Sequence, residues 1–91
     1  MGYGIEFARM ADDALVALPG MVAHTILQEI ETLSTDPVGL GKRSHFPFLP
    51  GRQMYQFEVE TDGQWWVTVF FRFSVDENRI IILDIAAMPT Q

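Results

Sequence analysis

Three stretches in the second half of the chain carry the apolar patterns of β-strands. Residues 55–60 place Tyr55, Phe57 and Val59 between polar residues, with the period of two expected of a half-buried strand. The stretches 65–75 and 79–87 are rich in β-branched and aromatic residues, which favour strands. Because only a few turn-forming residues separate these stretches, we predict an antiparallel meander.

The first half of the chain predicts one strand and two helices. Apolar and other residues alternate over 2–7, which indicates a strand. Apolar residues then recur at helical spacing over about 8–18 and again over about 21–33, and Pro19-Gly20 separates the two segments. The short connection predicts an antiparallel helix pair. The second helix should end before Pro37, since a residue that precedes proline avoids the helical conformation.

The register of the strands follows if both turns, 61–63 and 76–78, are three-residue loops, the first with Gly63 in the left-handed conformation. Phe57 then lies opposite Val67 and Tyr55 opposite Val69, while Phe70 lies opposite Asp84 and Arg72 opposite Ile82. A slip by one residue would bury Glu58 and Asp84. The face expected under the helices comprises Phe57, Val59, Trp65, Val67, Val69, Phe71 and Phe73. The outer face is expected to present Arg52, Met54, Gln56, Glu58, Trp66, Thr68, Phe70, Arg72 and Asp84.

These elements predict one α+β domain over residues 1–91, in the order β-α-α-β-β-β. A four-stranded, mainly antiparallel sheet should carry an αα-hairpin on one face. Residues 36–53 hold three prolines and three glycines, so we expect one long irregular loop there. Four of the eight Lys, Arg and His residues of the chain fall in this loop: Lys42, Arg43, His45 and Arg52.

Composition narrows the classes of function. Twelve acidic and six basic residues give a net charge of −6, whereas nucleic-acid binders usually present a basic surface. The absence of cysteine excludes disulfides and thiolate chemistry. No apolar run approaches the ~20 residues of a membrane span, and we expect a cytoplasmic protein without contact to membranes. His24 and His45 are far apart in sequence, so no metal or other cofactor is expected.

The whole chain resembles the RelE/ParE superfamily of toxins from bacterial toxin–antitoxin pairs. The most telling segments are the helix end Leu33-Ser-Thr-Asp-Pro37 and the aromatic strand that runs from Val69 into the turn at Val75-Asp76. The other matching segments are 3–7 leading into 11–18, 54–58 and 80–85. The resemblance implies a small α+β domain that cleaves messenger RNA on the ribosome or poisons gyrase, and that is held by a cognate antitoxin.

The resemblance also implies where the chemistry should lie. RNA-cleaving members use no metal; they place lysines and arginines on the sheet and a basic or aromatic residue near the C-terminus, because positive side chains must meet the developing negative charge. This chain has Gln56 and Glu58 at the matching positions of its second long strand, and Val69 near the position of an expected arginine. Residues 86–91 contain no basic residue, histidine or tyrosine. We therefore expect little or no RNA cleavage.

Two groups of residues remain as candidate sites. A displaced catalytic set would consist of Arg72, Arg52, His45 and Lys42, although Arg72 also suits an ion pair with Asp84 on its diagonal. Trp66, Phe70 and Met54, with Arg72, would form a protein-binding patch on the outer face, unless the loop 36–53 covers them.

Three hypotheses follow. The chain is a toxin-like protein that acts through binding, an RNA-cleaving toxin with the displaced set, or an interaction domain that binds another partner or a second copy. A cognate antitoxin or a homodimer is the expected partner, and the charge disfavours messenger RNA, the ribosome and gyrase.

Overall fold

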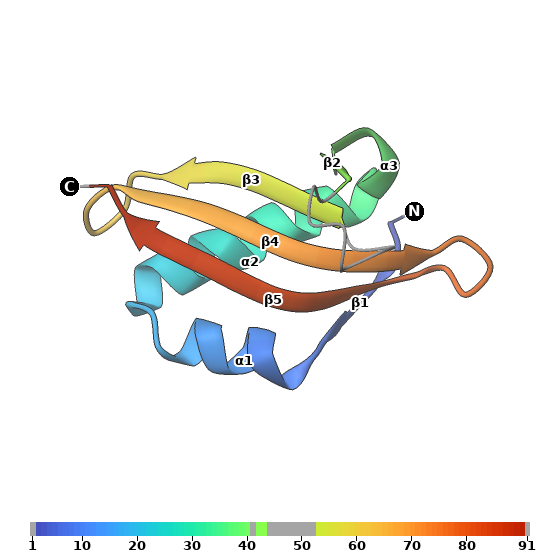
Figure 1. Cartoon of the computed structure of the whole chain (residues 1–91), viewed down its shortest axis with the longest axis horizontal. Helices are drawn as coiled ribbons and strands as arrows, with labels where there is room; N and C mark the ends of the chain where they lie inside the picture. The colour runs from blue at the N-terminus through green and yellow to red at the C-terminus, as the bar shows by residue number, and fades with distance from the viewer. Residues whose placement is uncertain (1, 41, 44–52, 91) are drawn as a thin grey trace.

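The computed structural model of this protein describes residues 2–40, 42–43 and 53–90. Its strands form a sheet, and helices lie against one face of that sheet (Figure 1). The longer elements follow the predicted order β-α-α-β-β-β of an α+β domain, and two short elements are added before the meander. The elements are β1 (Gly4–Phe7), α1 (Arg9–Val16), α2 (Gly20–Thr35), α3 (Pro37–Leu40), β2 (Lys42–Arg43), β3 (Gln53–Val59), β4 (Trp65–Ser74) and β5 (Arg79–Pro89).

The sheet has the strand order β1-β5-β4-β3-β2. The four longer strands are those predicted, and β3, β4 and β5 form the antiparallel meander. β1 runs parallel to β5, so the sheet is mixed. The two-residue strand β2 adds to β3 at the far edge and was not predicted.

The prediction of a wholly irregular stretch from 36 to 53 is wrong in its first part, where α3 and β2 lie. The helix α3 begins at Pro37, whose fixed φ suits a first helical position. The side chain of Asp36 supports it, because its Oδ1 accepts a hydrogen bond from the Gly39 N–H at 3.0 Å. Gln53, at the end of the predicted loop, is the first residue of β3. Residues 41 and 44–52 lie outside the described residues.

The first hairpin has the predicted register. Phe57 pairs with Val67 and Tyr55 with Val69. Gly63 takes a positive φ of 100°, as the turn requires, and Asp62 joins it with a φ of 53°. This pairing fixes which side chains of β3 and β4 face the helices.

The second hairpin departs from the prediction by one residue. Four residues connect Ser74 to Arg79, because Asn78 adopts a left-handed φ of 52° and extends the turn. A β-bulge leaves Leu83 without a partner and absorbs the difference. Phe70 therefore pairs with Asp84 as predicted, whereas Arg72 pairs with Ile81 and not with Ile82.

The hydrophobic core lies between the inner sheet face and the helices. Helix α2 buries the predicted stripe of Val22, Ile26, Ile30 and Leu33, and α1 contributes Ala11. Phe71 in β4 is fully buried among these residues. The sheet residues in the core are Val59, Val67, Val69, Phe71, Ile80, Ile82 and Ile85, with Phe57, Trp65 and Phe73 packed against them. The predicted choice of faces is confirmed.

Candidate functional site on the outer sheet face

The sheet face opposite α1 and α2 carries most of the residues that the sequence analysis selected as candidate binding or catalytic residues. Because Val67, Val69 and Phe71 point into the core, the alternate residues of β4 point outward. Their cross-strand neighbours complete this face, which we call the outer face. On β3 and β4 it includes Met54, Gln56, Glu58, Trp66, Thr68, Phe70 and Arg72, and β5 adds Ile81, Asp84 and Met88.

Three residues form a row across the end of the outer face near the first hairpin. Glu58 of β3 pairs with Trp66 of β4, which pairs with Met88 of β5. Trp66 is 38% exposed and Met88 is 64% exposed. We call this group of three residues the aromatic row, after Trp66 at its centre. Sequence reasoning selected Trp66 but missed Met88, which the pairing of Phe70 with Asp84 and the alternation along β5 would have placed there.

The other two predicted anchors are less exposed. Met54 and Phe70 pair across β3 and β4, and both are half-buried. Phe70 makes further contacts in the protein. Thr68, between Trp66 and Phe70, is buried and accepts a hydrogen bond from Nε2 of Gln56 at 3.1 Å. The exposed apolar surface is therefore concentrated at the aromatic row.

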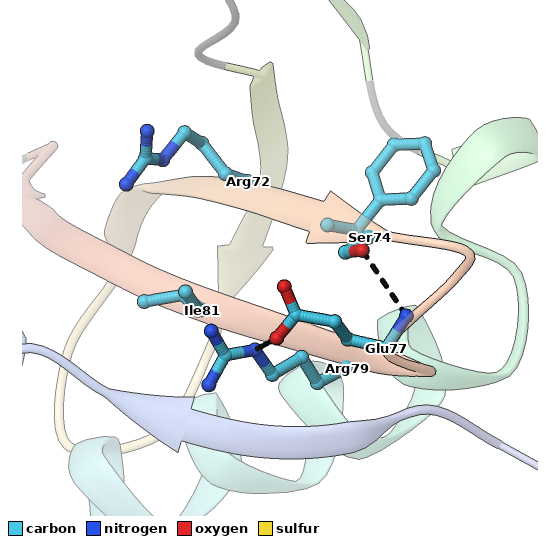
Figure 2. A pocket seen from close by; sticks show the side chains of 6 residues that line it. Arg72, Ser74, Glu77, Arg79 and Ile81 are labelled. Atoms are coloured by element: carbon cyan, nitrogen blue, oxygen red, sulfur yellow. Dashed lines mark hydrogen bonds and ion pairs between the residues drawn. The ribbon is translucent and has the colours of Figure 1, made fainter.

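A cavity of about 260 Å³ lies at the opposite end of the outer face, beside the second hairpin. Arg72 and Ser74 at the end of β4 line it, together with Arg79 and Ile81 at the start of β5 (Figure 2). Phe73 and Glu77 complete the lining. We call this cavity the arginine pocket. It was not predicted, because the four-residue turn that brings Arg79 opposite Ser74 was expected to contain three residues.

Arg79 is held by two carboxylates. Its Nη1 donates to both carboxylate oxygens of Glu6 in β1, each at 3.0 Å. Its Nε lies 2.7 Å from Oε2 of Glu77. This Nε is buried, yet its N–H makes no hydrogen bond, so the contact with Glu77 is an ion pair without good alignment.

Arg72 behaves differently from Arg79. Within the described part of the chain, its guanidinium has no ion pair or side-chain hydrogen bond, and it extends away from the Glu77 carboxylate (Figure 2). The predicted ion pair with Asp84 is not formed. The bulge at Leu83 separates the two residues, and Oδ1 of Asp84 accepts the backbone N–H of Ile85 at 2.8 Å.

The displaced catalytic set is only partly visible. Arg72 lies on the outer face, whereas His45 and Arg52 lie outside the described residues. Lys42 is described only through its backbone, in β2. The structure therefore does not show these four residues together.

The positions expected to hold cations do not hold them. Gln56 and Glu58 are exposed on the outer face, and Val69 is fully buried in the core. All twelve Asp and Glu side chains lie among the described residues, as do three arginines, at positions 9, 72 and 79. Positive charge on the described part of the outer face is therefore confined to the arginine pocket.

The described residues contain no cluster of three His, Asp or Glu side chains arranged to hold a metal ion. None of the described helices is long and apolar enough to cross a membrane.

Comparison with protein-family models and with curated protein sequences gives no match. Solved structures do match. A chain of the RelBE2 toxin–antitoxin complex from Mycobacterium tuberculosis superimposes with a TM-score of 0.80 at 17% identity, over 97% of this chain and 100% of that one. A chain of the intact RelBE toxin–antitoxin complex from E. coli superimposes with a TM-score of 0.66 at 10% identity, over 92% of this chain and 94% of that one. The free E. coli toxin RelE with two arginines replaced by alanine superimposes with a TM-score of 0.65 at 11% identity, over 94% of this chain and 83% of that one. The fold of this protein is that of the RelE-like toxins.

Proposed function

We propose that this protein is the toxin-like component of a bacterial toxin–antitoxin pair, and that it acts through protein binding in the cytoplasm rather than through RNA cleavage. The observation that carries this proposal is the outer face itself. It exposes the aromatic row, and it carries Gln56 and Glu58 at positions where the resemblance to RNA-cleaving toxins implies basic residues.

The chemistry of RNA cleavage without a metal explains why the described outer face is poorly suited to it. Attack by a ribose 2′-hydroxyl on phosphorus concentrates negative charge on the phosphate oxygens, so positive side chains must surround them. Arg72 and Arg79 lie together at one end of the face, and Arg79 already pairs with Glu6 and Glu77. Glu58 and Asp84 are carboxylates on the same face and repel phosphate.

A protein partner fits the same surface better. Exposed tryptophan and methionine side chains concentrate binding energy when a partner encloses them. Trp66 and Met88 are the exposed anchors, and Met54, Phe70 and Arg72 extend the proposed interface along β4. The similar solved structures include toxin–antitoxin complexes, which supports an antitoxin as the partner.

The test is association with the product of a neighbouring small gene. The two proteins are co-expressed, and the affinity of the purified pair is measured by calorimetry. We expect a stable complex, and Trp66→Ala with Met88→Ala should weaken it by roughly 30-fold or more, the effect of losing an interface hot spot. Val16→Ala is the matched control, because Val16 is 86% exposed but belongs to α1 on the other side of the sheet.

Two results would contradict the proposal. If the Trp66 and Met88 double variant binds as tightly as the parent protein, the interface lies elsewhere. If purified protein cleaves ribosome-bound messenger RNA and Arg72→Ala abolishes this activity, the protein is an RNA-cleaving toxin with a displaced site. Expression of the chain alone in a bacterial host, with growth and translation followed over time, shows which process is affected.

A further inference from the structure

We propose that the arginine pocket is a socket for a carboxylate group of the partner protein, and that Glu77 competes with this group for Arg79 in the free protein. The inference rests on the proposed function for the identity of the partner. It adds a second contact point to the interface, at the opposite end of the outer face from the aromatic row.

The volume and the lining of the pocket suit a small anion. A volume of about 260 Å³ has room for a carboxylate group and several water molecules, since one water takes about 30 Å³ in the liquid. Arg72 and Arg79 approach from neighbouring strands, and Ser74, whose hydroxyl accepts the backbone N–H of Glu77 at 3.2 Å, belongs to the lining (Figure 2). Guanidinium groups recognise carboxylates through paired, charge-assisted hydrogen bonds.

Glu77 pairs imperfectly with the arginines of the pocket. Its carboxylate is directed at Arg79 (Figure 2), but the buried Nε of Arg79 has no aligned hydrogen bond with it. Arg72 has no anionic partner among the described side chains. An incoming carboxylate can therefore engage Arg72 and displace Glu77, while Glu6 continues to hold Nη1 of Arg79.

The charges along the outer face favour a protein carboxylate over nucleic acid. A phosphate backbone brings a charge with every nucleotide, and it would meet Asp84 and Glu58 as it continued along β4. A single acidic side chain on a largely apolar or basic segment avoids this repulsion. Arg72 is six residues from Trp66 on β4, a separation of about 20 Å. The partner segment should therefore present an acidic residue about 20 Å from its apolar anchor.

The test uses acetate as the probe and needs no partner, so it fails or succeeds independently of the proposed function. The intact protein is titrated with sodium acetate at pH 7 and constant ionic strength, and its amide and arginine N–H signals are followed by NMR. We expect saturable shifts at Ser74, Glu77 and Arg79, and we expect Arg72→Gln to abolish them. Arg9→Gln, which removes the same charge from the start of α1, should leave them unchanged.

Displacement of Glu77 is tested separately. Glu77→Gln should tighten acetate binding about threefold to fivefold, the range that exposed ion pairs reach. Asp76→Asn is the matched control, because Asp76 belongs to the same turn but does not line the pocket. The NMR spectra themselves show whether each variant is folded.

The outcomes are decisive in both directions. The absence of saturable shifts in both the parent protein and Glu77→Gln would overturn the socket, as would binding that persists in Arg72→Gln. Equal affinity in Glu77→Gln and the parent would overturn the role of Glu77. Saturation by inorganic phosphate, at concentrations where acetate has no effect, would assign the pocket to phosphate groups and overturn the choice of a protein carboxylate.

Discussion

The hydrogen bond between Tyr55 and Glu29 ties β3 to α2, and its removal gives a stability change of known direction. The hydroxyl of Tyr55 donates to Oε2 of Glu29 at 2.8 Å. Tyr55→Phe deletes only this hydroxyl, and the ring stays beside Phe57, with 5.2 Å between the ring centroids. A hydrogen bond to a charged group contributes about 1.5–3 kcal/mol. Because both partners are only half-buried and water can replace the lost contact, we expect a loss of about 1–2 kcal/mol in the free energy of unfolding.

The same contact predicts a dependence on pH. Burial of the ring, the hydrogen bond to Glu29 and the negative charge of Glu29 together raise the pKa of Tyr55 to about 12. The unfolded chain loses this proton near pH 10, so the contribution of Tyr55 to stability is fully present below pH 10. It is lost as the pH rises from 10 to about 12. Glu29→Gln should lower the pKa of Tyr55 without restoring its ordinary value, because burial is the largest cause of the shift.

Urea unfolding of the parent protein and of Tyr55→Phe, from pH 7 to pH 12, measures both effects. The difference in stability between the two proteins should be constant up to about pH 10 and should shrink above it. The difference between their absorbance titrations at 295 nm isolates the ionisation of Tyr55. An ionisation of Tyr55 near pH 10, or equal stability of the two proteins at pH 7, would refute the reasoning.

Two further predictions concern the core and the second hairpin. Phe71→Ala should lower the free energy of unfolding by ~3–5 kcal/mol, because Phe71 is fully buried in the core. This loss is a large part of the roughly 5–14 kcal/mol of stability typical of a chain this long. Phe71→Leu is the variant to measure if Phe71→Ala does not fold. In urea unfolding, Trp66→Ala should lose much less stability than Phe71→Leu. The reverse order would mean that the face of Trp66, and not that of Phe71, lies in the core. Asn78→Gly should leave the stability nearly unchanged, whereas Asn78→Val should lower the free energy of unfolding by about 1–3 kcal/mol, since a β-branched residue tolerates the φ of 52° poorly. Equal thermal unfolding temperatures of the two variants would contradict this account of the turn.

Periodicity identified the main elements because burial follows the helical period in α2 and the period of two in the strands. The stripe of Val22, Ile26, Ile30 and Leu33 lies in the core as its spacing predicted, and so do Val67 and Val69 at a period of two. The short elements α3 and β2 were missed. Four residues and two residues are too few to show a period, and they form through a proline, an aspartate cap and pairing with β3.

The candidate site was predicted less completely than the fold. Trp66 and Arg72 were placed on the correct face, because their position depends only on alternation along one strand. Met88, Arg79 and Glu77 were missed as site residues. Met88 could have been placed from the predicted pairing of Phe70 with Asp84. The placement of Arg79 and Glu77 depends on the length of the second turn and on the bulge, which arise from the backbone conformation of one or two residues rather than from a repeated pattern.

The extra residue in the second turn changes the surroundings of Arg72. In a regular ladder Arg72 would lie opposite Ile82, with Asp84 on its diagonal, and the two opposite charges would satisfy each other. The bulge at Leu83 instead keeps Asp84 opposite Phe70 and places Arg72 opposite Ile81, one position closer to the second hairpin. Arg79 and Glu77 enter the same neighbourhood because the turn has four residues. Arg72, which would have been a structural partner of Asp84, is thereby left at the edge of the arginine pocket, where we propose that it binds a carboxylate group of a partner.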